Sequence, residues 1–223
     1  MTDPKEHIHS EKILTILACE HIAAKVKSLD NFWINRNRFY TLGAATYQDD
    51  PLAYPAIANA FNLIISKHFW RLLDHIDVVI SKIKQAENTT LLDMAYPSFH
   101  IFDHEANGLE GQIHVDEPYE RIELPEGWSD PFSFTMAVEL PAGGGGMNYW
   151  KGITDEQMEH YKVFPVGIPT PEYFPYELGV LYVHSGLFPH QISSPCTIGE
   201  DEYRITLQGH GVVLRSGHVA LYF

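Results

Sequence analysis

Residues 112–116 read QIHVD, and this alternation of polar and apolar side chains is typical of a β-strand. Side chains two positions apart on a strand project from the same face of the sheet. His114 and Asp116 can therefore reach one metal ion together. The sequence predicts a metal-binding strand at this point.

Two other histidines precede an acidic residue at the same spacing, His9 before Glu11 and His75 before Asp77. The first pair lies where a polar tail meets the start of an expected helix, and the second lies within a long expected helix. Residues two apart on a helix point to nearly opposite sides, so these pairs are poor chelators. The strand pair is the better candidate for a metal.

Beyond residue 95 the chain consists of short runs rich in Val, Ile, Phe and Tyr, separated by Gly, Pro, Asp and Glu. Such runs predict strands and turns, and the glycines at 143–146 predict a tight turn between two of them. Many short strands favour a closed or sandwich-like β architecture, of which the jelly roll is one solution. The predicted strands are 98–103, 112–116, 132–140, 147–150, 178–184, 190–194, 203–213 and 218–223.

The first 95 residues have a helical pattern instead. Ser10 is expected to cap a first helix whose apolar residues fall on one face. A longer helix is expected from Pro55 to about Lys84, because apolar residues recur there every three or four positions and proline suits a first turn. The sequence predicts one domain, with residues 1–95 as mainly helical support and residues 96–223 as the β core.

The chain carries a formal net charge of −14, with only 15 Lys and Arg side chains. Nucleic acids and anionic membrane surfaces bind clustered basic residues, so neither is expected as a partner. The first apolar run, residues 13–18, is too short for a signal-peptide core or a membrane span, so a cytoplasmic protein is expected. Cys19 and Cys196 are isolated, which argues against a zinc ribbon or a disulfide framework.

A second histidine is needed to complete the set of two histidines and one carboxylate that binds iron(II) and leaves coordination positions open. The candidates are His184, His190 and His210. A later strand begins near Arg204, and it places the side chains of Arg204 and Thr206 on one face, which can hold a carboxylate.

The spacing of the last strands favours His190 among these candidates. If residues 195–202 connect two paired strands, Arg204 lies about one pair from His190. His184 then pairs too far along the hairpin for one co-substrate to bridge it and Arg204.

Four segments together resemble the iron(II)/2-oxoglutarate oxygenases, in a prolyl-hydroxylase-like order. The resemblance covers roughly residues 96–215, and it is specific as an ordered set: His-x-Asp, a glycine-rich strand start, a distal histidine, then Arg-x-Thr. The segments are FHIFDHEANGLEGQIHVD at 99–116, TMAVELPAGGGGMNYW at 135–150, GVLYVHSGLFPHQI at 179–192 and YRITLQGHG at 203–211.

The resemblance implies a double-stranded β-helix, a cupin-like jelly roll, with supporting helices. It implies iron(II) bound by His114, Asp116 and His190 as the catalytic centre. It also implies that Arg204 binds the distal carboxylate of 2-oxoglutarate and that Thr206 adds a hydroxyl group. An arginine suits a dianion in a low-dielectric interior, because its guanidinium is bidentate and stays protonated.

The sequence leaves a competing interpretation of Arg204 open. In this interpretation its side chain lies on the surface and forms an ion pair with Glu200, Asp201 or Glu202.

The residue that contacts the other end of 2-oxoglutarate is also open, with His100, His104 and Gln112 as candidates. Tyr149 and Trp150 are expected to be core aromatic residues.

The function implied by the resemblance is oxidation of a small organic substrate, such as an amino acid or a natural-product intermediate. Iron(II), 2-oxoglutarate and O₂ are the implied cofactor and co-substrates, with ascorbate as a supporting reductant. Hydroxylation is the expected outcome, and desaturation, epoxidation and cyclisation stay open. Two alternatives remain: an iron oxidase of the same fold that does not use 2-oxoglutarate, and a non-catalytic β-barrel binding protein. The sequence does not specify the oligomeric state.

Overall fold

Strand β11 (Arg204–Val213) lies at the centre of the fold, because three other strands pair with it. The computed structural model describes residues 8–37, 39–89, 94–106, 111–153, 155–163, 166–193 and 198–223. The helices are α1 Ile16–Lys27, α2 Tyr54–Lys84 and α3 Asp155–Val163, with short 3-10 turns at Asp30–Phe32, His104–Ala106 and Pro118–Arg121. The other strands are β1 His9–Lys12, β2 Ile34–Asn35, β3 Tyr40–Leu42, β4 Glu87–Thr89, β5 Ser98–Phe102, β6 Ser129–Glu139, β7 Gly146–Tyr149, β8 Glu172–Pro175, β9 Val180–His184, β10 His190–Ile192 and β12 His218–Tyr222.

The strands form two sheets. The large sheet has the order β1-β9-β6-β11-β5-β3-β2, and β12 and β4 extend it beside β11. The small sheet has the order β10-β7-β8, and an antiparallel bridge between His114 and His190 adds one more segment to its edge. The chain is therefore mainly β, as the sequence predicts.

Side chains along β11 point alternately to the two faces of the large sheet, and these faces differ in polarity. Ile205 and Leu207 belong to the main hydrophobic core, whereas Arg204 and Thr206 project from the opposite face. His210 lies on the same face as Arg204 by this period of two. The large sheet therefore has an apolar outer face and a polar inner face.

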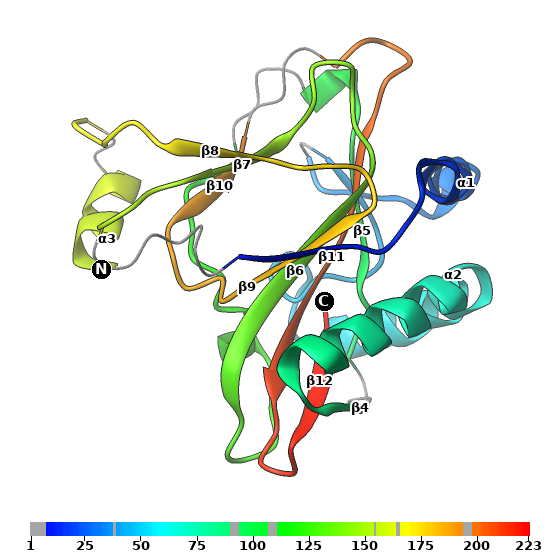
Figure 1. The fold of residues 1–223 in the computed structure, drawn as a ribbon, viewed down its shortest axis with the longest axis horizontal. Coiled ribbons are helices and arrows are strands. Elements are labelled where there is room, and N and C mark those ends of the chain that lie inside the picture. The colour runs from blue at the N-terminus through cyan, green and yellow to red at the C-terminus, as the bar shows by residue number, and fades with distance from the viewer. Residues whose placement is uncertain are drawn as a thin grey trace.

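Helices α1 and α2 cover the outer face. Phe69 of α2 packs on Phe99 of β5 with ring centroids 4.8 Å apart, and Cys19 of α1 is buried in the same cluster. Figure 1 shows both helices on one side of the large sheet and the small sheet on the other. The predicted long helix is confirmed with a one-residue difference at its start, and it packs on the apolar outer face of the large sheet.

The expected first helix begins later than the sequence suggests. Residues 9–12 form strand β1, which pairs with β9, so Ser10 is not a helix cap. The helix starts at Ile16, and Thr15 caps it by accepting a hydrogen bond from the amide of Ala18 at 3.2 Å. The described part of the first 95 residues also contributes the short strands β1 to β4 to the large sheet, so it is not helical throughout.

The expected pairing of the strands around residues 195–202 is wrong. Strand β10 pairs with β7 in the small sheet, whereas β11 pairs with β5, β6 and β12 in the large sheet. The chain changes sheet between them. Strand β9, which carries His184, pairs with β1 and β6 instead of β11.

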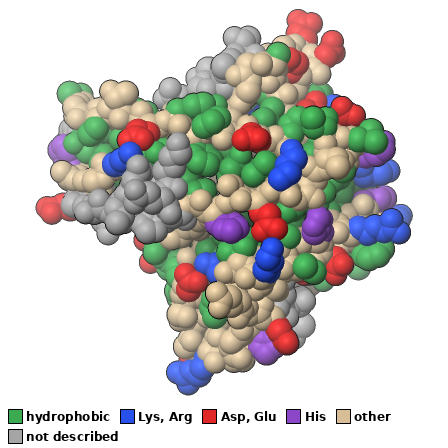
Figure 2. All heavy atoms as spheres, viewed as in Figure 1, with side chains coloured by type: hydrophobic (Ala, Val, Ile, Leu, Met, Phe, Trp, Pro, Cys, Tyr) green, Lys and Arg blue, Asp and Glu red, His purple; other side chains and the backbone are tan. Residues whose placement is uncertain are grey.

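The surface agrees with the acidic composition. On the face shown in Figure 2, basic side chains stand in small groups between acidic ones. None of the described helices is long and apolar enough to cross a membrane. Cys19 is buried, and Cys196 lies outside the described residues.

Candidate metal centre

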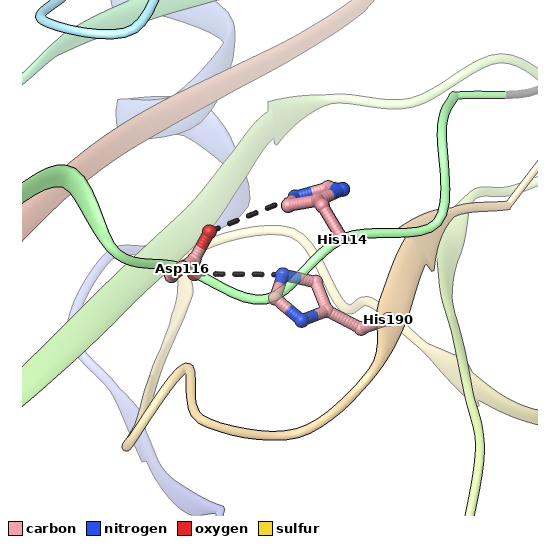
Figure 3. A group of neighbouring side chains, drawn as sticks. All are labelled: His114, Asp116 and His190. Atoms are coloured by element: carbon pink, nitrogen blue, oxygen red, sulfur yellow. Dashed lines mark ion pairs between the residues drawn. The ribbon is translucent and has the colours of Figure 1, made fainter. Parts of the chain in front are cut away.

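His114, Asp116 and His190 meet at the edge of the small sheet. Their ligand atoms all lie within 4.8 Å of one another. Nε2 of His114 is 3.6 Å from Oδ1 of Asp116, and Nε2 of His190 is 3.4 Å from Oδ2 (Figure 3). The carboxylate thus stands between the two imidazole rings, with one oxygen toward each.

Backbone hydrogen bonds fix this arrangement. The amide of His114 donates to the carbonyl of His190 and the amide of His190 donates to the carbonyl of His114, both at 2.9 Å. The amide of Asp116 donates to the carbonyl of Gly186, also at 2.9 Å. The expected strand at 112–116 is thus a single bridge, but it places His114 and Asp116 as predicted.

Both histidines have a defined ring orientation. Nδ1 of His114 lies 2.7 Å from the carbonyl of Gln112, and Nδ1 of His190 lies 2.8 Å from the carbonyl of Phe188. A carbonyl only accepts, so each Nδ1 carries the proton. Each Nε2 faces Asp116, and it is the ring nitrogen through which each histidine can coordinate a metal.

The electrostatics keep the carboxylate ionised. Burial acts to raise the pKa of Asp116, but the charge of His190 and its hydrogen bond, together with His210 and His114, hold that pKa well below the usual range. Burial also acts to lower the pKa of His190, and Asp116 outweighs it, so the pKa of His190 is raised. The site therefore contains an anionic oxygen donor, the carboxylate of Asp116, beside two imidazole rings.

This donor set fits a divalent first-row metal. Two imidazole nitrogens and one carboxylate on one side of an ion leave further coordination positions free, which is the arrangement of non-haem iron(II) sites. The side chains of Asp116 and His190 are 15% and 8% exposed, whereas that of His114 is 43% exposed. The site is accordingly reachable from the side of His114.

Arg204 is buried on the inner face, with a relative exposure of 1%. Its Nη1 donates to the carbonyl of Ser193 at 3.1 Å and its Nη2 to the carbonyl of Gly146 at 2.9 Å. Its Nε has no hydrogen-bond partner among the described residues. No carboxylate of the described residues forms an ion pair with it, so the competing interpretation as a surface partner of residues 200–202 is wrong.

Two aromatic rings flank the guanidinium. The carbon between its nitrogens is 5.6 Å from the ring centre of Tyr176 and 5.8 Å from that of Phe102. Burial raises the pKa of Tyr176; the charge of Arg204 acts to lower this pKa, and the charge of Asp116 acts to raise it. The phenol of Tyr176 therefore interacts electrostatically with both groups. Sequence reasoning missed Tyr176, although the Tyr, Phe and Tyr at 173, 174 and 176 resemble a strand pattern that predicts β8.

Thr206 lies on the same face as Arg204 and is fully buried. Its hydroxyl accepts a hydrogen bond from Nε2 of Gln208 at 3.0 Å. His100 is directly opposite Thr206 on β5, and Nε2 of His100 contacts the hydroxyl of Tyr47. Nδ1 of His100 is buried and has no hydrogen-bond partner in the part of the chain that the structure describes. Among the three candidates for the far end of a co-substrate, only His100 is buried on this face.

The remaining predicted residues lie as follows. His104 is exposed in a 3-10 turn, and Gln112 contributes its carbonyl to His114 while its side chain is exposed. His218, which is not one of the predicted site residues, lies on strand β12 near Glu87 of β4. Tyr149 and Trp150 are buried, as predicted.

No known protein-family model matches the chain. No curated protein matches it in sequence.

Solved structures share its fold. An N-substituted L-amino acid dioxygenase from Burkholderia ambifaria, in complex with alpha-KG, matches with a TM-score of 0.61 at 12% identity over 97% of this chain and 86% of that one. HygX from Streptomyces hygroscopicus, with nickel, 2-oxoglutarate and hygromycin B bound, matches with a TM-score of 0.55 at 12% identity over 92% and 82%. The alpha-ketoglutarate-dependent epimerase SnoN matches with a TM-score of 0.55 at 11% identity over 92% and 76%. The chain therefore has the fold of 2-oxoglutarate-dependent oxygenases.

Proposed function

We propose that this chain is an iron(II)- and 2-oxoglutarate-dependent oxygenase that oxidises a small organic substrate. The two sheets then correspond to the halves of a double-stranded β-helix, and the chain is one oxygenase domain. His114, Asp116 and His190 are the metal ligands of this proposal. The shared fold and the donor set support it, and a location in the cytoplasm stays a prediction.

The observation that carries the proposal is the buried, uncompensated charge of Arg204. Its Nη1 contacts the carbonyl of Ser193, three residues beyond His190, so the guanidinium lies beside the sheet that holds both histidine ligands. A buried cation without a carboxylate partner is costly unless a ligand supplies the anion. A ligand with one carboxylate for Arg204 and a second chelating end for the metal fits both features.

The residues of the chain have separate tasks in this proposal. Arg204 binds the distal carboxylate of 2-oxoglutarate through its guanidinium, and the hydroxyl of Thr206 donates a further hydrogen bond. Phe102 and Tyr176 exclude water from this ion pair, which strengthens it. Iron(II), when bound, supplies the activation of O₂ that couples decarboxylation of 2-oxoglutarate to oxidation of a substrate C–H bond. The carboxylate of Asp116 occupies a ligand position, which favours hydroxylation over halogenation.

The substrate class is proposed from the neighbours in fold and from the absence of a basic stripe in the sequence. The dioxygenase from B. ambifaria acts on N-substituted L-amino acids, and HygX binds hygromycin B. We propose a free small molecule of this size range, an amino acid or a natural-product intermediate.

The deciding experiment is anaerobic calorimetry of 2-oxoglutarate with the Mn(II)-loaded protein. One binding site is expected. Alanine at His114, Asp116 or His190 should remove stoichiometric Mn(II) binding while the melting temperature of the apoprotein stays close to the wild-type value. His218→Ala is the matched control, because His218 is half-exposed beside Glu87 on another strand.

The alternatives give different results in the same titrations. An iron oxidase without a co-substrate would bind Mn(II) and not 2-oxoglutarate, and a binding protein would bind neither. With Fe(II), ascorbate and O₂, the proposed enzyme should also convert 2-oxoglutarate slowly to succinate without its substrate. No 2-oxoglutarate binding to the Mn(II) form would reject the co-substrate assignment.

A further inference from the structure

The turn that follows β9, residues 184–186, lies directly against Asp116. The carbonyl of Gly186 accepts the hydrogen bond of the Asp116 amide at 2.9 Å. The amide of Gly186 donates to Nδ1 of His184 at 3.0 Å. The backbone of this turn is therefore bonded to the carboxylate residue on one side and to an imidazole ring on the other.

Gly186 also leaves space that no other residue would leave. Its φ is +71°, in the left-handed region, and a Cβ at this position would lie 2.7 Å from Cβ of Asp116 and 2.8 Å from Oγ of Ser133. Real Cβ atoms do not make contacts this short. A side chain at 186 would therefore force Asp116 or Ser133 to move.

His184 has a fixed role beside the metal ligands without being one of them. It is buried, and its ring centre is 5.6 Å from that of His190 and 5.3 Å from that of Phe188. Because its Nδ1 accepts the amide proton of Gly186, its own proton is on Nε2. His184 is not part of the group of possible metal ligands found among the described residues, which consists of His114, Asp116 and His190.

We propose that His184 and Gly186 are positioning residues for the metal site. The His184 ring holds the amide of Gly186, and the carbonyl of Gly186 then sets the position of Asp116 between the two histidine ligands. This inference rests on the proposed metal-binding function and extends it to two residues that do not contact the ion.

The first test compares two glycine substitutions. Gly186→Ala should weaken Mn(II) binding by about tenfold or more, the usual effect of removing support behind a metal ligand. Gly217→Ala is the matched control, because its φ is +80° and no atom lies within 4 Å of an added Cβ. Mn(II) affinity is measured by electron paramagnetic resonance of the free ion, and the Co(II) absorption spectrum reports the ligand geometry.

The second test uses His184 and remains decisive if Gly186→Ala does not fold. His184→Ala removes the acceptor for the Gly186 amide and should weaken Mn(II) binding and alter the Co(II) spectrum. His184→Asn places an amide oxygen where Nδ1 lies, so it should restore much of the affinity. A residue that only fills space would not show this recovery.

The outcomes separate the inference from the proposed function. If the wild-type protein binds Mn(II), and His184→Ala and a folded Gly186→Ala bind it as tightly as Gly217→Ala, the positioning role is wrong and the metal site stands. If His184→Asn behaves like His184→Ala, the hydrogen bond to Gly186 is not the cause. If the wild-type protein binds no Mn(II), the proposed function fails and the inference fails with it.

Discussion

Replacing Arg204 by Ala is the perturbation that tests the proposed co-substrate site most directly. The guanidinium is buried and unpaired, so its charge is available to a ligand carboxylate in a low-dielectric environment. Removing one partner of a buried, hydrogen-bonded ion pair costs about 3–5 kcal/mol. At roughly 1.4 kcal/mol for each factor of ten, the dissociation constant of 2-oxoglutarate should rise by about two to three and a half orders of magnitude.

The control variants follow from the contacts of Arg204. Arg204→Met keeps apolar bulk between Phe102 and Tyr176, so it should lose affinity like Arg204→Ala without leaving a cavity. Arg204→Lys should recover only part of the affinity, because an ammonium is a point charge without the planar fork. Arg71→Ala removes a positive charge from the exposed surface of α2 and should leave the affinity unchanged.

The assay is anaerobic calorimetry of 2-oxoglutarate with the Mn(II) form of each variant, with Mn(II) binding measured separately. Metal binding should persist in all Arg204 variants, because Arg204 contacts none of the three ligands. A dissociation constant for Arg204→Met within threefold of the wild-type value would refute the assignment of Arg204 to the carboxylate.

Two further predictions concern stability. Burial lowers the pKa of His100 to about 3, below the ordinary value of 6.5. Between these two pH values the unfolded chain binds a proton that the folded chain excludes. The free energy of unfolding should therefore fall by about 1.4 kcal/mol for each unit by which the pH is lowered from 6.5 to 3. Urea denaturation at several pH values should show a shallower fall for His100→Gln, and equal slopes would contradict this. Phe69→Ala should lower the free energy of unfolding by about 3–5 kcal/mol, because the Phe69 ring packs on Phe99 and is 4% exposed. The neighbouring Trp70→Ala should change the free energy of unfolding little, because Trp70 is 57% exposed. Denaturant midpoints compare the two variants, and similar losses would contradict the packing of α2 on the large sheet.

The strands were largely predictable because their side chains alternate between two environments. Along β11 the apolar residues pack against the helices and the polar ones face inward, so the period of two is visible in the sequence. Strand β1 was not predictable in this way, because it is an exposed edge of four residues and its pairing with β9 depends on the folded chain. Strand β8 is also short and largely exposed, and its two central aromatic residues are the signal by which the sequence could have indicated it.

The proposed metal ligands could be predicted in part for a local reason. His114 and Asp116 are two residues apart on extended backbone, so local geometry alone brings them together. His190 was selected by a hairpin that does not exist, yet Arg204 does lie near it. The contact is made by the side chain of Arg204, which reaches across to the carbonyl of Ser193 in the small sheet. Sequence spacing cannot describe a contact between two sheets.

The roles of Gly186 and Tyr176 required the three-dimensional structure. Gly186 is 70 positions from Asp116 in the chain, and nothing local distinguishes it from the other glycines. Its effect arises from the close approach of a turn to a residue of another segment. Tyr176 similarly reaches Arg204 only because β8 and β11 belong to different sheets that face each other.

Arg204 has no carboxylate partner among the described residues, although the chain is rich in acidic side chains. The sequence has 29 Asp and Glu residues, and three of them, at 200–202, immediately precede the strand. Glu202 is the nearest of the three to Arg204 in the sequence, and its carboxylate accepts hydrogen bonds from the amides of Ala142 and Gly199. The carboxylate of Glu202 is therefore held by backbone amides and not by Arg204. A buried cation maintained under these conditions is the arrangement expected of a binding site for an anionic ligand.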